Sequence, residues 1–378
     1  MKILYLTLLH DGKINGGYTY RKMIAVSIKN IVGYENLDII LPEGDKNNWD
    51  CNVVMRLKSY TSSMDKIINL LQGNITQRRN KDIKKIVNLI NENHYDIVVF
   101  GNSETGKLIK KVKQKCNVKT ITIYNDIVTD AITKNKKKSF NIKKIPIWNA
   151  EIKAEKIDSK LTDIAVVLHK RDADLLYRHC GRKTNIFLPI ALQDNFKTYN
   201  FKDSKIDDML QLLFVGSYNW KANIESIKWF CENVMTRLKD YKVILNIAGY
   251  EMEKLMKEDW VIPFQNIRIL GTVPDLSQVY KEADLVVEPI IFGSGMKVKT
   301  AEALMYGKEI IGTYEAFVGY EELNEFICET AEDFVNAIVK YIDNKPPKFV
   351  KKNRIAYENN YSLIGMKNRL EIMLENLK

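Results

Sequence analysis

The stretch PIIFGSGMKVKTAEALMYGKEIIGT, Pro289–Thr313, places a glycine-containing loop and an amphipathic segment between two apolar runs. The first run is typical of a buried strand that ends near Glu288, and the pattern after the loop predicts a helix from about Lys297 to Tyr306. Strand, tight loop and helix in this order form the repeating unit of a parallel sheet covered by helices. The stretch therefore predicts an α/β domain.

The same alternation extends along the whole chain. Apolar runs separated by amphipathic segments begin at Lys2, Leu37, Asp96, Lys119, Ile164 and Asn185, and again at Leu210, Lys242, Asn266, Ala283 and Glu309. A polar segment at 194–208 without apolar periodicity separates the two sets and is predicted to be a linker. We therefore predict two doubly wound domains, at residues 1–197 and 209–345, and a helical segment at 346–378.

Composition favours an intracellular protein of two domains. The 378 residues exceed the usual size of one domain, and no run approaches the roughly 20 apolar residues of a membrane helix. The five cysteines are scattered without a CxxC pair, which predicts reduced thiols and no structural zinc. The first residues indicate a buried strand rather than a signal peptide. We expect a cytoplasmic protein that needs neither a metal nor a cofactor.

Positive charge is concentrated in the first half of the chain. Residues 1–200 carry 35 Lys+Arg against 20 Asp+Glu, whereas residues 201–378 carry 23 against 27. The densest stretches are KLIKKVKQK at 107–115 and KNKKKSFNIKK at 134–144. Such a surplus indicates an anionic membrane surface or a polyphosphate-linked substrate, with a solvated lysine-rich face as the alternative. Neither stretch interleaves the aromatic side chains of a nucleic-acid groove, so we expect no nucleic-acid partner.

The opening stretch also predicts an anion site. Glycines at 293 and 295 let backbone N–H groups approach a ligand, and the first turn of the following helix presents unpaired N–H groups. Lys299 adds a full positive charge there, and Glu302 lies on the same helical face one turn further on. A carboxylate beside a phosphate site can accept hydrogen bonds from ribose hydroxyls. Together these residues predict a pocket for a nucleoside diphosphate.

At this point the sequence resembles a known family. LLFVGSYNWKANIESIKWF, NIAG, IRILGTVPDLSQVYKEADLVVEP, FGSGMKVKTAEALMYGKEIIGT and FVGYEEL are similar in order and spacing to the nucleotide-binding domain of family-4 retaining glycosyltransferases. The Gly-Ser-Gly loop is that of a subgroup of the bacterial surface-glycan type. The resemblance implies the GT-B fold, in which two Rossmann-like domains face a central cleft. It assigns the acceptor to the first domain and the donor to the second, and NNYSLIGMKNRLEIMLENL to a segment crossing back.

The resemblance also implies roles for individual residues. Glu302 matches the glutamate that binds the ribose hydroxyls, and Lys299 with the N–H groups of Gly295 and Met296 fits the diphosphate. Ser294 stands where most relatives have the first glutamate of the same motif, which faces the donor sugar. The implied donor-binding set is Gly16, Gly17, Ser217, Lys221, Gly293, Ser294, Gly295, Met296, Lys297, Lys299 and Glu302. Gly16-Gly17 could equally be an ordinary turn before a helix.

The first half departs from the family pattern. Where relatives commonly carry a histidine facing the donor sugar, this chain has Tyr124, Asn125 and Asp126. Asn125, Asp126 and Lys299 are the residues that we predict to be catalytic. The missing histidine keeps open a degenerate binding subunit, and a nucleotide-sugar epimerase is a further alternative. His10 and Asp11 could reach an acceptor hydroxyl.

The predicted function is transfer of a sugar from a nucleotide diphosphate donor, UDP-linked in this prediction, to a hydroxyl of a glycan, glycoconjugate or lipid-linked acceptor. Retention of configuration and independence from metal are implied by the resemblance, and the basic first domain would meet the inner face of a membrane. Two nearby residues are predicted to be structural. Asp275 caps the helix that follows it, with Gln278 as its partner in a capping box, and Gly307 ends the helix after Lys297.

Overall fold

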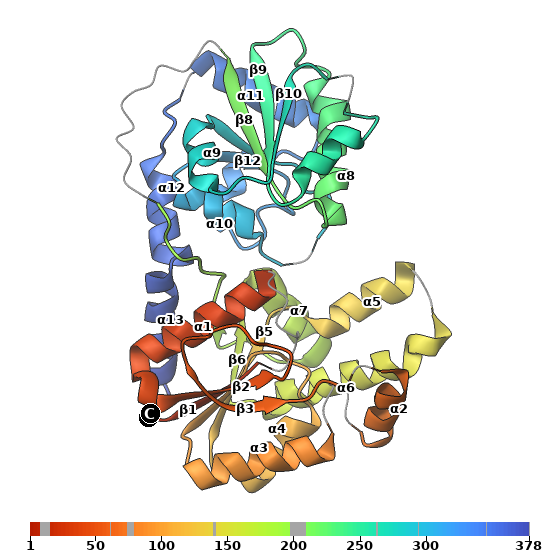
Figure 1. Cartoon of the computed structure of the whole chain (residues 1–378), viewed down its shortest axis with the longest axis vertical. Helices are drawn as coiled ribbons and strands as arrows, with labels where there is room; N and C mark the ends of the chain where they lie inside the picture. The colour runs from red at the N-terminus through yellow and green to blue at the C-terminus, as the bar shows by residue number, and fades with distance from the viewer. Residues whose placement is uncertain are drawn as a thin grey trace. The chain divides into compact units, whose positions relative to one another are not determined.

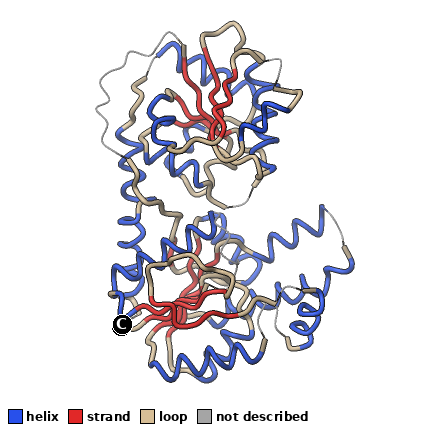
Figure 2. The backbone as a smooth tube through the Cα atoms, in the orientation of Figure 1, coloured by secondary structure: helices blue, strands red, loops and turns tan. Residues whose placement is uncertain are grey.

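The computed structural model describes residues 1–7, 16–60, 62–73, 79–138, 141–196, 209–261, 264–293, 295–344 and 346–377. The chain divides into two compact units, Met1–Pro189 with Met366–Lys378, and Ile190–Gly365. In each unit a parallel sheet lies between layers of helices (Figure 1, Figure 2). Residues 190–196 and 346–365 cluster with the second unit, and residues from 366 onward cluster with the first, so these borders differ from the predicted ones.

The first unit contains a seven-stranded parallel sheet in the order β3-β2-β1-β4-β5-β6-β7. Its strands are β1 (Ile3–Leu6), β2 (Leu37–Pro42), β3 (Asn52–Leu57), β4 (Ile97–Phe100), β5 (Lys119–Tyr124), β6 (Ile164–Val167) and β7 (Ile186–Phe187). Its helices are α1 (Gly16–Val32), α2 (Ser63–Leu71), α3 (Asn80–Asn93), α4 (Lys107–Lys115), α5 (Val128–Lys138), α6 (Ile145–Leu161) and α7 (Lys170–Cys180). All six strands predicted for this half are present. The edge strand β3 was not predicted, and only Leu57 among its residues is buried.

The second unit contains a five-stranded parallel sheet in the order β10-β9-β8-β11-β12. Its strands are β8 (Leu210–Val215), β9 (Val243–Ala248), β10 (Ile267–Gly271), β11 (Leu285–Glu288) and β12 (Glu309–Gly312), all five predicted from the sequence. Its helices are α8 (Lys221–Phe230), α9 (Leu276–Glu282), α10 (Val298–Met305), α11 (Ala331–Asn344) and α12 (Lys351–Ala356), and α13 (Leu363–Glu375) leads into the first unit. The fold class is therefore confirmed as two doubly wound α/β units.

The segment before the second sheet is fastened to the C-terminal helices. Tyr357 donates a hydrogen bond from its hydroxyl to the carbonyl of Leu192 at 2.9 Å. The guanidinium of Arg354 pairs with the Asp194 carboxylate, with Nη1 and Oδ1 3.1 Å apart. Leu192 also forms a parallel bridge with Ser362. Asp194, at the start of the predicted linker, is thus held by an ion pair.

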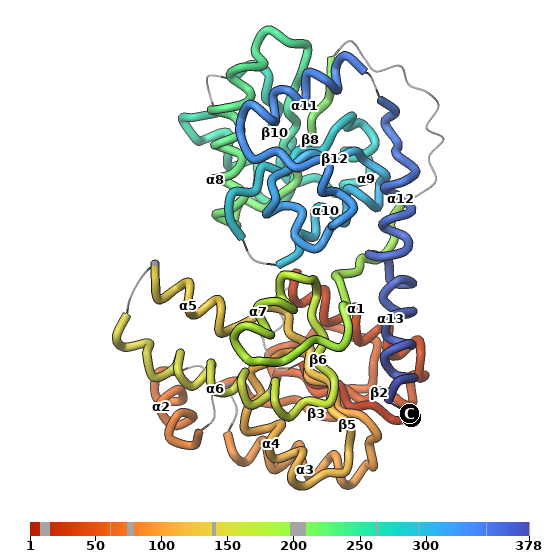
Figure 3. The backbone as a smooth tube through the Cα atoms, turned by 180° about the vertical axis from the view of Figure 1, so that it is seen from behind, coloured from red at the N-terminus to blue at the C-terminus, as the bar shows by residue number. Residues whose placement is uncertain are grey.

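Helix α13 buries four apolar side chains. Its buried side chains are Met366, Leu370, Met373 and Leu374, each about 1% exposed. The end of the chain lies near the N-terminal strands in both views (Figure 1, Figure 3).

Throughout the described ranges, no helix has both the length and the apolar character that a membrane span requires.

Candidate functional site

The loop between β11 and α10 is held from within by Lys297. The Lys297 ammonium donates to the Gly295 carbonyl at 2.8 Å and pairs with the Glu315 carboxylate at 3.0 Å. Gly295 has a φ of +63°, which favours glycine. A Cβ on Gly293 would lie 3.2 Å from Lys297 Cε, so the lysine and the loop fit closely. Lys297 therefore stabilises the loop, and Glu315 neutralises its charge. Ser294 lies outside the described residues.

The N-terminus of α10 is fixed by contacts from the segment after β12. Tyr320 donates from its hydroxyl to the Lys297 carbonyl at 2.6 Å, just before the first turn of the helix. Met296 is buried and packs against Gly319, where an added Cβ would lie 2.7 Å from Met296 Cγ. No side chain caps the first N–H groups of α10 among the described residues. These N–H groups keep the anion-binding character of a helix N-terminus.

Lys299 connects α10 to the carboxyl end of β8. Its ammonium donates to Asn223 Oδ1 at 2.8 Å and lies 4.2 Å from the centroid of the Phe214 ring. Asn223, 7% exposed in the first turn of α8, donates in turn to the Ser217 carbonyl at 3.0 Å. Burial lowers the pKa of Lys299, and the nearby carboxylates of Glu288 and Glu302 counter that effect. A partly desolvated cation is thus held where β8 and β11 end.

A buried carboxylate lies next to this lysine. Glu288, the last residue of β11, is 1% exposed and accepts a hydrogen bond from Thr300 Oγ1 at 2.7 Å. Its other oxygen, Oε1, has no hydrogen-bond partner among the described residues. Burial raises the pKa of Glu288, whereas the positive charge of Lys299 acts in the opposite direction. Glu288 is thus a buried carboxylate beside Lys299.

Glu302 carries the second carboxylate of the site. It is half-buried, and no side chain in the described ranges donates a hydrogen bond to it. Burial raises its pKa to about 7, Lys299 lowers it, and Glu288 adds to the increase. Because its oxygens have no protein partner among the described residues, they remain able to accept hydrogen bonds from a ligand.

Two other predicted donor residues of the second unit differ in their surroundings. Ser217 is half-buried and its carbonyl accepts from Asn223. Lys221, the first residue of α8, has a side chain that is 82% exposed and pairs with Glu225 at 2.9 Å. The hydrogen bond to Glu225 raises the pKa of Lys221. At the carboxyl end of β8, the side chain that contacts Lys299 is therefore that of Asn223, and Lys221 lies at the surface.

The predicted residues of the first unit lie at the carboxyl ends of its strands. Gly16 and Gly17 are exposed and form the first turn of α1. Asn125, directly after β5, donates from Nδ2 to the Gly101 carbonyl at 2.8 Å. Asp126 is exposed. His10 and Asp11 lie outside the described residues.

Asp275 and Gly307 were predicted to cap and to end helices near the site. Asp275 caps α9 as predicted, accepting from the Ser277 backbone N–H at 2.8 Å. The predicted capping box is wrong, because Gln278 donates to the Glu282 side chain at 2.6 Å. Gly307 follows α10 with a φ of +62°, which confirms it as the residue that ends the helix.

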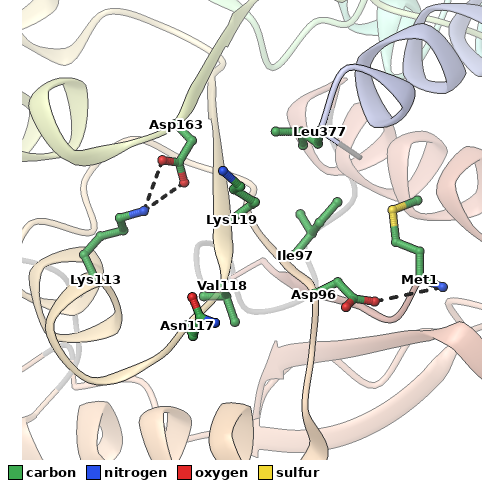
Figure 4. A pocket seen from close by; sticks show the side chains of 9 residues that line it. All are labelled: Met1, Asp96, Ile97, Lys113, Asn117, Val118, Lys119, Asp163 and Leu377. Atoms are coloured by element: carbon green, nitrogen blue, oxygen red, sulfur yellow. Dashed lines mark hydrogen bonds and ion pairs between the residues drawn. The ribbon is translucent and has the colours of Figure 1, made fainter.

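A pocket of about 550 Å³ lies at the amino ends of β4 and β5 in the first sheet. Its charged lining residues are Asp96, Lys113, Lys119 and Asp163, and Met1 and Leu377 lie beside them (Figure 4). Asp163 pairs with Lys113 at 2.9 Å, and Asp96 with the N-terminal amine at 3.9 Å. Ligands of doubly wound sheets bind outside the carboxyl ends of the strands, so this pocket is not the predicted site.

Asn223 is the site residue that the sequence analysis missed. It is 76 residues from Lys299 along the chain, and only the pairing of β8 with β11 brings the two together. One signal was present in the sequence, namely a polar residue in the first turn of the helix after β8, where an apolar residue would be expected to pack. Within the described residues, no group of histidine, cysteine or carboxylate side chains is arranged to hold a metal ion.

Comparison with known proteins identifies one family match and several similar folds. Residues 210–344 match the family described as Glycosyl transferases group 1. Sucrose-phosphate synthase from Thermosynechococcus elongatus has a similar structure at 14% identity, with a TM-score of 0.68, over 100% of this chain and 99% of that one. Anabaena HepE in complex with UDP is 13% identical, with a TM-score of 0.69. The lipopolysaccharide outer core galactosyltransferase WaaB is 12% identical, with a TM-score of 0.70. Each of these comparisons covers 100% of both chains.

No curated protein sequence matches this one. The sheet orders, the coverage of both units by the solved structures and the match over 210–344 agree with one another. The chain has the GT-B fold, and residues 210–344 of its second unit are similar to the glycosyl transferases group 1 domain.

Proposed function

We propose that this protein is a glycosyltransferase that moves a sugar from a UDP-sugar to a hydroxyl of a glycan, glycoconjugate or lipid-linked acceptor. The proposal rests on the match of the second unit to glycosyl transferases and on one arrangement of residues in it. Lys299, the N-terminus of α10 and the unpaired carboxylate of Glu302 lie within one and a half turns of the same helix. Anabaena HepE, which shares the fold, is described in complex with UDP and with UDP-glucose.

These groups would stabilise the diphosphate as it leaves the sugar. Negative charge grows on the phosphate oxygens as the bond to the sugar breaks. The N–H groups at the start of α10, those of Gly295 and Met296, and the Lys299 ammonium would meet that charge without reorganising. Removing one preorganised donor of this kind typically costs about 10²–10³ in rate. Glu302 would accept hydrogen bonds from the ribose hydroxyls and so position the nucleoside.

We further propose that transfer is independent of a metal and retains the configuration of the donor sugar. The protein's own cation and helix end would balance the charge for which other enzymes use a divalent ion. Retention follows from the family resemblance of the second half. In the first unit, Asn125 and Asp126 are the proposed catalytic residues, and Gly16-Gly17, at the start of α1, is the proposed contact with the donor phosphates.

Calorimetry with UDP and GDP tests the donor site. We expect Lys299→Ala and Glu302→Ala each to weaken binding of the preferred nucleotide by at least about tenfold, because each removes a charged hydrogen-bond partner. Lys228→Ala is the matched control, since Lys228 is an exposed lysine further along α8 that lies 3.8 Å from Glu232. Wild-type affinity in both Lys299→Ala and Glu302→Ala would exclude this loop as the nucleotide site.

A non-catalytic binding subunit is the second candidate. It is favoured by Asn125, whose amide is engaged with the Gly101 carbonyl, and by the absence of a histidine at 124–126. Slow release of free sugar from UDP-sugar without acceptor would identify a transferase, whereas tight UDP-sugar binding without any turnover would identify a binding subunit. A changed sugar still attached to UDP would identify an epimerase.

A further inference from the structure

Helix α2 of the first unit turns an apolar face outward. Among its nine residues the structure buries only Asn69. Met64, Ile67 and Leu71 are 71%, 56% and 83% exposed. Their spacing of three and four residues places them on one side of the helix. A helix in a globular protein normally buries such a stripe, so this one has no partner within the described part of the chain.

A hollow lies beside this helix, where α2, α4 and α6 meet. Its volume is about 530 Å³. Helix α6 packs against both α2 and α4, and α2 lies next to α6 in both views of the fold (Figure 1, Figure 3). The apolar side chains that line the hollow are those of Leu70, Ala150, Ala154 and Ile157. Four lysines also line it, namely Lys107, Lys110, Lys111 and Lys153.

Helices α2 and α4 offer these lysines no unpaired carboxylate. Lys107 donates to the Gln72 carbonyl at 2.6 Å and Lys111 to the Gln114 side chain at 3.2 Å, and both acceptors are neutral. In the described ranges, none of the four lysines forms an ion pair. Helix α4 contains no acidic residue. The one carboxylate of α2, Asp65, pairs with Arg79 at 2.5 Å. The surface therefore combines an apolar stripe with four lysines that form no ion pair in the described ranges.

We propose that this surface docks the protein on an anionic lipid bilayer. The side chains of Met64, Ile67 and Leu71 would enter the boundary between headgroups and acyl chains, and the lysines of the hollow would contact lipid phosphates. Apolar burial and attraction to anionic headgroups together are the usual basis of such binding. This inference goes beyond the proposed activity and does not depend on it. It also gives a location to part of the positive surplus noted in the sequence.

A second copy of the chain is a poorer occupant. A two-fold dimer places the same patch of both subunits against each other. The lysines of the hollow would then face their own copies, and like charges brought together in a desolvated interface are unfavourable. A bilayer rich in anionic lipid offers the opposite charge over the whole surface. Charge complementarity therefore selects the membrane.

Flotation of the full-length protein with vesicles tests the proposal. The vesicles contain phosphatidylcholine alone or phosphatidylcholine with phosphatidylglycerol. We expect binding only to the anionic vesicles, and weaker binding as salt is added. Leu71→Asp should reduce vesicle binding at least about tenfold, and so should the double variant Lys110→Glu with Lys111→Glu. Each lysine that contacts headgroups contributes about a factor of five in affinity, and an inserted leucine contributes more. These side chains are at the surface, so circular dichroism should show unchanged folding.

Two matched controls separate this surface from diffuse charge and general hydrophobicity. Lys84→Glu with Lys85→Glu changes the charge of the first unit by the same amount at exposed positions on α3. Ile372→Asp introduces the same group at a 59% exposed isoleucine on α13. Both controls should bind anionic vesicles like the wild type.

Several results would overturn the proposal. They are a wild-type protein that does not float with anionic vesicles, a Leu71→Asp variant that floats normally, and an α3 control that loses as much binding as the α4 pair. Sedimentation provides one more. If Leu71→Asp dissociates a dimer while vesicle binding is unchanged, the surface is a protein interface and the membrane is not its partner.

Discussion

At the scale of single residues, the site contains charges that the fold does not fully satisfy. Glu302 is half-buried without a hydrogen-bond donor among the described residues, and Glu288 Oε1 is buried without one. Such groups are costly to keep in a folded protein, because burial penalises the charged form. They persist where a ligand supplies the missing partners. The two carboxylates near Lys299 therefore predict measurable effects of pH on both binding and stability.

Binding of UDP should depend on the ionisation of Glu302. Its pKa of about 7 means that the carboxylate loses its charge as the pH falls below neutrality, and with it its capacity to accept two strong hydrogen bonds. We expect UDP affinity to increase several-fold between pH 6 and pH 8 (about one pH unit on either side of that pKa). In Glu302→Gln this part of the increase should be absent. The UDP phosphate also titrates in this range, but it does so equally with both proteins, so their difference isolates Glu302.

Stability should respond to pH in the opposite sense. The folded-state pKa of Glu302 lies above its ordinary value of 4.5, so below that value both folded and unfolded forms are protonated and there is no penalty. As the pH rises from 4.5 to about 7 the unfolded chain releases its proton first, and stability is lost. Glu302→Gln should therefore melt at a higher temperature than the wild type at pH 8, and at nearly the same temperature about one pH unit below 4.5, where the glutamate is protonated in both states. Equal melting temperatures at pH 8 would contradict the burial of this carboxylate.

At the scale of elements, helix α6 organises the helices on its side of the first sheet. Its Asp158 accepts from the Thr105 N–H at 2.7 Å, from Thr105 Oγ1 at 2.8 Å and from the Gly106 N–H at 2.7 Å, at the start of α4. Its Glu155 accepts from the N–H groups of Val128 and Thr129, both at 2.8 Å, at the start of α5. Two buried carboxylates three residues apart thus cap two different helices, although neither caps its own.

Removing one of these caps should destabilise the first unit. Asp158→Ala leaves three buried donors without an acceptor, and we expect a loss of about 3 kcal/mol in the free energy of unfolding. Asp174→Ala, at an exposed position on α7, is the control and should change it by less than about 0.5 kcal/mol. Urea denaturation measures both. Hydrogen exchange should place the lost protection in the first turn of α4, and unchanged protection there would argue against the cap.

At the scale of the whole molecule, the chain enters the second unit once and returns to the first for its last residues. Met366–Lys378 belongs to the first unit, and its four apolar side chains on α13 are almost completely buried. Each such side chain stabilises a fold by about 1.5–3 kcal/mol. The stability of the first unit therefore depends on the far end of the sequence, whereas Lys299, Glu302 and the N-terminus of α10 lie in Ile190–Gly365.

Truncation after Gly365 should separate the two units functionally. We expect the first unit to unfold or to exchange its amide hydrogens rapidly, because a domain with a free energy of unfolding of 5–15 kcal/mol cannot lose about 6 kcal/mol or more without consequence. UDP binding should persist, although weakened by the loss of any contact from Gly16-Gly17, since Lys299 and Glu302 lie in the second unit. Calorimetry and hydrogen exchange on the same sample measure both properties. A chain ending at Asn376, which keeps all of α13, is the control.

The sequence by itself determined the features that depend on neighbours along the chain. The eleven predicted strands, the loop and helix after β11, the end of α10 at Gly307 and the Asp275 cap were readable because periodicity and turn chemistry act over a few residues. Only the tertiary structure decided which side chains meet. Lys299 and Asn223 are 76 residues apart, and the contacts of α6 with the starts of α4 and α5 join residues up to 53 apart. Strand order and helix packing create such contacts, and no local pattern encodes them.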